Sequence, residues 1–159
     1  MKSISKIWAT AAMLMLSATS IAQISKVEII ATGLTCSMCS NAINKQLKTL
    51  PEVTKVDTDL DKSTFVIQLK NPNNLTPKHF KDKVEKAGFS VGSMVVTAAS
   101  SIVVTAPYQA INNPITTATL HRIKILDKGY VSTKEFKNTA AKKSLRDKNE
   151  TLFHFQYLD

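Results

Sequence analysis

Apolar and charged residues alternate along residues 25–31, where Val27 and Ile29 are flanked by Lys26 and Glu28. A period of two residues places the apolar side chains on one face of an extended chain. This pattern predicts a first strand, which a glycine ends.

From Ser37 onward the period changes to three or four residues. The apolar positions of this stretch are Cys39, Ile43, Leu47 and Leu50. Positions with this spacing share one stripe of a helix. We therefore expect a helix from about Ser37 that ends at Pro51, because proline lacks the backbone N–H that a helix interior uses.

Two β-rich runs, residues 53–59 and 64–69, surround a polar turn and predict a hairpin. Thr76 and Pro77 are then typical of a helix N-terminus. The buried stripe of this second helix is expected at Phe80, Val84 and Ala87. A final strand over residues 91–97 completes the order β-α-β-β-α-β, which is the split βαβ, or ferredoxin-like, arrangement.

The pattern beyond residue 98 is less regular. Residues 98–101 are expected to form a linker, residues 102–106 a short strand, and residues 107–118 a loop rich in proline and asparagine.

Two more strands are predicted at residues 120–126 and 152–157. Between them, Ser132 and Glu135 have the spacing of a capping box for a helix that runs to about Leu145. The sequence thus predicts an α+β protein: a ferredoxin-like βαββαβ sandwich followed by a smaller α/β, ββαβ-like, C-terminal region.

The first 22 residues have the pattern of a cleavable signal peptide. Lys2 and Lys6 provide a positive start, residues 7–16 an apolar run, and a small-x-small site ends at Ala22, so the mature chain would begin at Gln23. The apolar run is shorter than the roughly 20 residues that span a bilayer. We therefore expect a periplasmic or secreted protein without stable membrane insertion, with a first domain at 23–98 and a region of unknown role at 99–159.

The chain is basic, with a formal net charge of +9. Removal of Lys2 and Lys6, in a segment without acidic residues, leaves +9 − 2 = +7. A positive surface favours encounter with acidic partners. Nucleic acid is not expected as a partner, because the lysines are scattered and an exported protein rarely meets it.

The two cysteines, Cys36 and Cys39, are the strongest chemical signal in the sequence. They lie where the first strand leads into the first helix, and a helix N-terminus favours the thiolate, the form of cysteine that binds metal. Two soft thiolates suit a soft ion of low coordination number such as Cu(I). A structural zinc site would need four ligands, and no second pair with suitable spacing exists to complete it.

The segment from Gly33 to Cys39, on a strand-to-helix junction followed by β-β-α-β, resembles the heavy-metal-associated family of copper chaperones, copper-ATPase modules and periplasmic mercury-binding proteins. The resemblance covers about residues 26–96. Leu34 stands at the family's methionine position, and Thr35 precedes the first cysteine as in the copper-type pattern.

This resemblance implies that Cys36 and Cys39 are the metal ligands. It implies Cu(I) as the cargo, with Hg(II) or Zn(II) as alternatives, and a metal-transporting ATPase or another acidic metal-accepting protein as the partner. No phosphate-binding loop or clustered carboxylate pair accompanies the cysteines. The chain is accordingly expected to bind and transfer metal and not to be an enzyme.

Other interpretations of the cysteine pair stay open. It could serve thiol-disulfide exchange, form a structural disulfide, or belong to an interaction module that has lost its metal role. Among further candidate ligands, Met38 and His79 are expected to be surface residues. His121 and His154 are expected to be unrelated strand residues, although neighbouring strands could bring them together.

Overall fold

The computed structural model describes residues 24–34, 36–103, 107–113, 118–143 and 152–158. The predicted signal peptide therefore lies outside the described residues, as do Thr35 and the predicted end of the last helix near Leu145.

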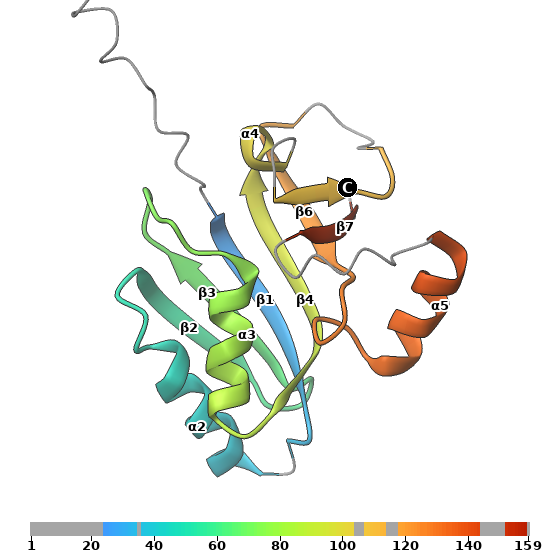
Figure 1. Cartoon of the computed structure of the whole chain (residues 1–159). Coiled ribbons are helices and arrows are strands. Elements are labelled where there is room, and N and C mark those ends of the chain that lie inside the picture. Colours follow the sequence, from blue (N-terminus) through green and yellow to red (C-terminus); the bar gives the residue numbers. More distant parts are fainter. Residues whose placement is uncertain (1–23, 35, 104–106, 114–117, 144–151, 159) are drawn as a thin grey trace, which may run out of the picture.

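The first six elements follow the predicted β-α-β-β-α-β order (Figure 1). They are β1 (Ile24–Thr32), α2 (Ser37–Leu47), β2 (Val53–Asp59), β3 (Thr64–Leu69), α3 (Pro77–Lys86) and β4 (Ser90–Ala99). Their strands are antiparallel neighbours in the order β2-β3-β1-β4. Both helices lie over the same face of the sheet (Figure 1). This is the ferredoxin-like arrangement, and the predicted fold is confirmed.

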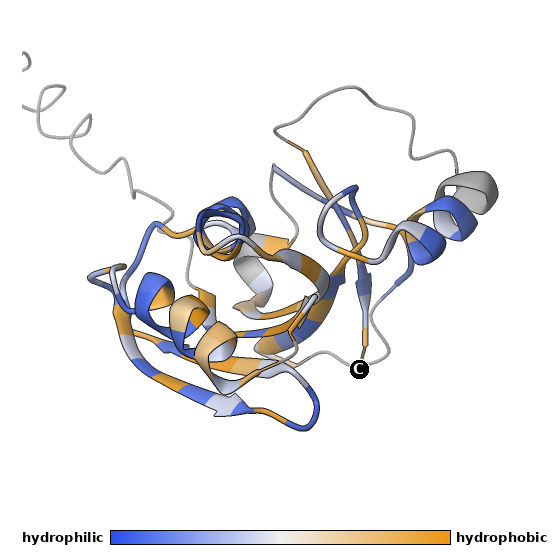
Figure 2. Cartoon of the chain, turned by 90° about the horizontal axis from the view of Figure 1, so that it is seen from below, coloured by the Kyte–Doolittle hydropathy of each residue, from blue (hydrophilic) through white to orange (hydrophobic). Residues whose placement is uncertain are grey.

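The core lies between the two helices and the sheet. Alternate residues of β1, among them Val27 and Ile29, are fully buried, and hydrophobic and hydrophilic colours alternate along the strands in Figure 2. The helix stripes face the same interior. Its other fully buried members from this part of the chain include Ile43, Leu47, Phe65, Ile67, Phe80, Val84 and Met94. This packing fixes the ends of the strands, and therefore the loops that connect them.

The C-terminal part differs locally from its prediction. Its elements are α4 (Ser100–Val103), β5 (Tyr108–Ala110), β6 (Leu120–Ile125), α5 (Thr133–Lys143) and β7 (Phe153–Tyr157). The expected linker is replaced by the end of β4 and the start of α4. The expected strand at 102–106 is wrong where it is described, because Ile102 and Val103 belong to this helical turn and Val103 is buried.

A strand also occurs inside the expected loop at 107–118. β5 pairs in parallel with β7, placing Tyr108 opposite Phe153. The backbone N–H of Phe153 donates to the carbonyl of Pro107 at 2.7 Å. The two predicted longer strands, β6 and β7, and the helix between them are present.

The C-terminal strands extend the first sheet. β6 pairs antiparallel with β4, β7 pairs antiparallel with β6, and the complete order is β2-β3-β1-β4-β6-β7-β5. Within the described part of the chain, no helix is both long and apolar enough to cross a membrane. The boundary between a metal domain and a C-terminal region at residues 98 and 99 stays a prediction, since the sheet runs across it.

Candidate metal site

The loop before α2 presents the cysteine pair. Gly33 has a backbone φ of +84°, a conformation that costs glycine little and other residues more. Leu34 is half-buried and packs against the core, so it anchors this loop to the rest of the domain. A Cβ atom built on Gly33 would lie 4.0 Å from Cδ1 of Phe89, so the α3–β4 connection lies beside the same loop.

Cys36 and Cys39 are brought together as the sequence predicts. Cys36 is the N-cap of α2, with φ −153° and ψ 160°, and its carbonyl accepts hydrogen bonds from the backbone N–H groups of Cys39 and Ser40 at 3.2 and 3.4 Å. The two Sγ atoms are 2.8 Å apart and share a hydrogen bond. Neither cysteine is in a disulfide, and Cys36 is exposed while Cys39 is half-buried.

The surroundings lower the pKa of Cys36 below its ordinary value. The hydrogen bond with the Cys39 thiol is the largest cause, followed by the backbone N–H groups of Cys39 and Met38. No side-chain capping hydrogen bond forms at Cys36. The N–H groups therefore lower its pKa as nearby partial positive charges at the start of the helix. The site therefore favours a thiolate, the form that binds soft metals.

The donor set suits a two-coordinate soft ion. Among the described residues, no group of three or more histidine, cysteine or acidic side chains could hold a metal. Metal–thiolate bonds of about 2.3 Å, the value for zinc, would put the sulfurs about 4.6 Å apart in a linear arrangement. The Sγ atoms must therefore separate when an ion enters, and the exposed Cys36 side chain has room to rotate.

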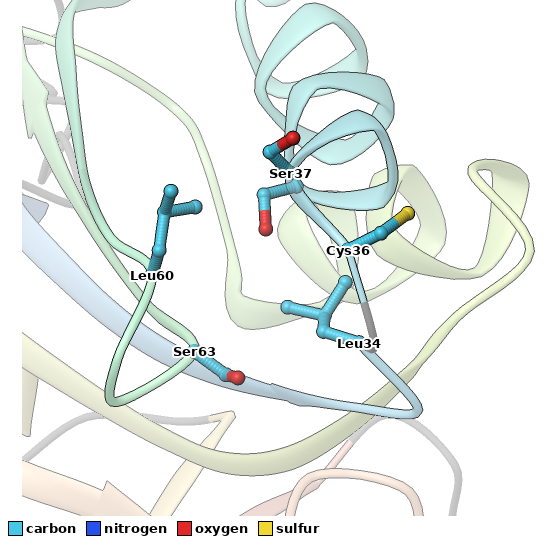
Figure 3. A pocket seen from close by; sticks show the side chains of 6 residues that line it. Leu34, Cys36, Ser37, Leu60 and Ser63 are labelled. Atoms are coloured by element: carbon cyan, nitrogen blue, oxygen red, sulfur yellow. The ribbon is translucent and has the colours of Figure 1, made fainter.

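A shallow hollow of about 220 Å³ adjoins the pair (Figure 3). Its walls come from the loop between Gly33 and Cys36, called the metal loop below, from the start of α2 and from the β2–β3 turn. The lining residues are Leu34, Cys36, Ser37, Ser40, Leu60 and Ser63. The sequence predicts the β2–β3 turn but gives no direct sign that it faces Cys36. The antiparallel pairing of β1 with β3 explains this position, because it places the β2–β3 turn next to the C-terminal end of β1.

The sequence profile of the heavy-metal-associated domain matches residues 28–90, which contain both cysteines and the helices α2 and α3. This part of the chain is a heavy-metal-associated domain.

Two kinds of known protein resemble this heavy-metal-associated domain. A copper-transporting ATPase of Saccharomyces cerevisiae is 42% identical over 57 residues, which are 36% of this chain and 6% of that protein. The chain thus spans only a small part of its relative's length. The solved yeast copper transporter domain Ccc2a, studied in apo and Cu(I)-loaded states, is 35% identical, with 41% of this chain and 88% of that chain covered and a TM-score of 0.38.

A copper-binding domain from the P-type ATPase HMA7 is 29% identical. The match covers 42% of this chain and 88% of that one, with a TM-score of 0.38. Each of these similarities covers less than half of the chain.

The other candidate ligands lie away from the pair or serve another purpose. Met38 is exposed. His79 is exposed, as expected, and its Nδ1 accepts a hydrogen bond from the backbone N–H of Thr76 at 3.0 Å, which closes a capping box at the start of α3. The Thr76-to-His79 spacing was the available signal, although glutamate or glutamine is the usual partner.

The structure does not bring His121 and His154 together. The carbonyl of His154 accepts a hydrogen bond from the N–H of Leu126. His154 therefore lies opposite Leu126, which is five positions after His121 in the sequence. Nδ1 of His154 instead lies 2.8 Å from a carboxylate oxygen of Asp127. The ring of His121 packs edge-on against Tyr157, with ring centres 5.0 Å apart. Both histidines are buried structural residues.

Proposed function

We propose that the mature chain binds one Cu(I) ion through the thiolates of Cys36 and Cys39 and passes it to a metal-accepting protein. The observation that carries this proposal is the geometry of the pair: two thiols, not joined in a disulfide, lie within contact distance at the exposed start of a helix in a heavy-metal-associated domain. The function is binding and transfer, without catalysis.

The small number of ligands supports transfer over storage. An ion held by two protein sulfurs stays open to a third, so a thiolate of the acceptor can bind before Cys36 or Cys39 lets go. The exposure of Cys36 leaves room for that approach. Closed four-ligand sites, by contrast, hold metal for structural purposes.

The proposed acceptor is a metal-transporting ATPase or another acidic metal-accepting protein. The relatives at this domain include parts of copper-transporting ATPases. The basic side chain of Lys86 ends α3 three residues before Phe89, which lies beside the metal loop. Positive charge near the site would steer an acidic surface toward it.

The two thiolate ligands suit Cu(I) better than Zn(II). Zn(II) favours four ligands in a tetrahedral site, and the described residues offer the pair no third histidine, cysteine or acidic side chain. Hg(II) shares the preference for thiolates, so it is the closer competitor. A competition between Cu(I) and Hg(II) for the reduced protein would rank the two ions.

Export is the second part of the proposal. If residues 1–22 are a signal peptide, protein recovered from the periplasmic or culture fraction should begin at Gln23. Recovery of a cytoplasmic chain that still begins at Met1 would contradict it. An oxidising compartment also requires a reductant for the pair, because a disulfide cannot ligate metal as thiolates do.

The metal proposal is tested by titrating the reduced mature protein with Cu(I) in competition with a chromogenic chelator. One equivalent should bind tightly, and the Cys36→Ser, Cys39→Ser double variant should lose this binding. Equal binding by the double variant would exclude the pair as the site.

The 2.8 Å separation of the thiols also favours a second function, thiol-disulfide exchange. This alternative predicts catalysis of insulin reduction by the same pair. Weak Cu(I) binding together with insulin reduction would replace the first proposal by the second.

A further inference from the structure

The hollow beside Cys36 has an unusual lining for a protein surface. Its six residues are apolar or carry hydroxyl or thiol groups, and none is charged. At its rim, Leu60 is 55% exposed, and on α2, two residues after Cys36, Met38 is 81% exposed. These are the two most exposed of the large apolar side chains in the described part of the chain.

The β2–β3 turn that carries Leu60 is held against the end of β1. The backbone N–H of Ala31, at the end of β1, donates to the carbonyl of Ser63 at 3.1 Å. Within the turn, the N–H of Ser63 donates to the carbonyl of Leu60 at 3.3 Å, and the N–H of Lys62 to a carboxylate oxygen of Asp59 at 3.1 Å. Leu60 is therefore exposed from a turn of defined conformation.

The size of the hollow indicates what it can hold. Small-molecule pockets usually measure about 300–1,000 Å³, whereas this one measures about 220 Å³. Cys36 forms part of the wall, and in Figure 3 its Sγ points away from Leu60. A protein that takes a metal ion from this thiolate would approach beside the hollow. An uncharged side chain next to the acceptor's own thiolates would fill the hollow during that approach.

We propose that the hollow between α2 and the β2–β3 turn receives an uncharged side chain of the protein that accepts metal from Cys36, with Leu60 as its main apolar contact. This inference rests on the proposed function. In this arrangement the β2–β3 turn docks the acceptor, and the cysteine pair binds the metal.

The charges around the site favour one orientation of the acceptor. The turn carries two aspartates, Asp59 and Asp61, against the single Lys62. An acidic surface is therefore repelled on this side and attracted on the α3 side, where Lys86 lies. The acceptor would place its acidic residues over α3 and its apolar side chain over Leu60.

The test measures Cu(I) transfer from the full mature chain to two acceptors: the yeast copper transporter domain Ccc2a and a small chelator. Leu60→Ser should slow transfer to the protein domain about tenfold, because the apolar contact is lost, and leave transfer to the chelator unchanged. Leu60→Met, which keeps an apolar side chain of similar volume, should transfer at the normal rate. Leu120 on β6 is 50% exposed, so Leu120→Ser is the matched control and should change neither rate.

Each other result has a defined meaning. Unchanged transfer from Leu60→Ser to the protein domain would overturn the inference, as would equal slowing with both acceptors or with Leu120→Ser. These results would leave the proposed function intact, since the chelator titration measures that separately. If the unaltered protein binds no Cu(I), the proposed function fails and the docking inference fails with it.

Discussion

The reactivity of Cys36 depends on two neighbours with different origins. The Cys39 thiol is a side-chain partner that a mutation can remove, whereas the N–H groups of Met38 and Cys39 belong to the backbone of α2. Because the thiol is the larger cause of the lowered pKa, the pair is chemically more than two independent ligands. The Cys39 thiol thereby favours the thiolate form of Cys36.

Removing the thiol of Cys39 should therefore raise the pKa of Cys36. In a Cys39→Ala variant, the midpoint of Cys36 alkylation against pH should move upward, and alkylation at pH 7 should slow, because less thiolate is present. The rate is measured by iodoacetamide labelling and mass spectrometry of the peptide that contains Cys36.

Met38→Ala provides the control for this experiment. It changes an exposed side chain and keeps the backbone N–H that faces the sulfur, so the midpoint should stay in place. A midpoint that is the same in Cys39→Ala and the unaltered protein would show that the helix N-terminus alone sets the pKa of Cys36.

The site residues differ in how far the sequence predicts them. Cys36 and Cys39 are three positions apart, so a local spacing rule is enough to bring them together. Leu60 reaches the site only through the pairing of β2, β3 and β1, which no local pattern encodes. His121 and His154 show the reverse case, since their adjacent strands are paired in a register that keeps the two rings apart.

Among the elements, α3 has an N-terminus that uses an uncommon partner. Thr76 is its N-cap and Pro77 its first residue, as predicted, while the side chain of His79 replaces the usual glutamate or glutamine. The imidazole Nδ1 accepts the N–H of Thr76. A histidine that the sequence suggests is merely solvated thus satisfies a backbone donor.

Replacing His79 by alanine should lower the free energy of unfolding by about 0.3–1.5 kcal/mol, the usual range for one capping interaction. His79→Gln should retain most of the stability, because glutamine at this position can also accept the N–H of the N-cap residue. Urea denaturation of the three proteins measures the difference. A glutamine variant as unstable as the alanine variant would argue against the capping role.

Elements were predicted best where their signals are local. The six elements up to β4 follow from alternation, helical stripes and end signals within a few residues. At Ile102 and Val103, β-branched residues favoured a strand, but the chain forms a helical turn that buries Val103. β5 escaped prediction because its three residues owe their strand geometry to β7, more than 40 positions later.

The whole molecule is organised around a sheet that crosses the expected domain boundary. Val96 of β4 lies opposite Ile123 of β6, and both side chains are fully buried. Tyr130, in the turn before α5, also lies near α3, with Nζ of Lys81 5.9 Å from the centre of its ring. The C-terminal strands therefore protect an edge that a four-stranded sheet would leave unpaired, and such edges invite pairing with other chains.

A continuous sheet and core should unfold in one cooperative step. All three tyrosines, Tyr108, Tyr130 and Tyr157, lie beyond residue 99, and the mature chain lacks the single tryptophan, which is in the predicted signal peptide. Tyrosine fluorescence thus reports on the C-terminal part alone, while far-ultraviolet circular dichroism reports on both parts. Coincident denaturation curves from the two probes would indicate a single transition.

Two buried isoleucines sharpen this prediction. Ile67 lies on β3 in the heavy-metal-associated domain and Ile123 on β6 beyond it, and both are fully buried. Ile67→Ala and Ile123→Ala should each lower the free energy of unfolding by about 2–5 kcal/mol and shift both probes together. If Ile123→Ala moved the fluorescence curve and left a separate, unshifted step in circular dichroism, the heavy-metal-associated domain would be an independent folding unit, and its edge at β4 would be stable without the strands that now cover it.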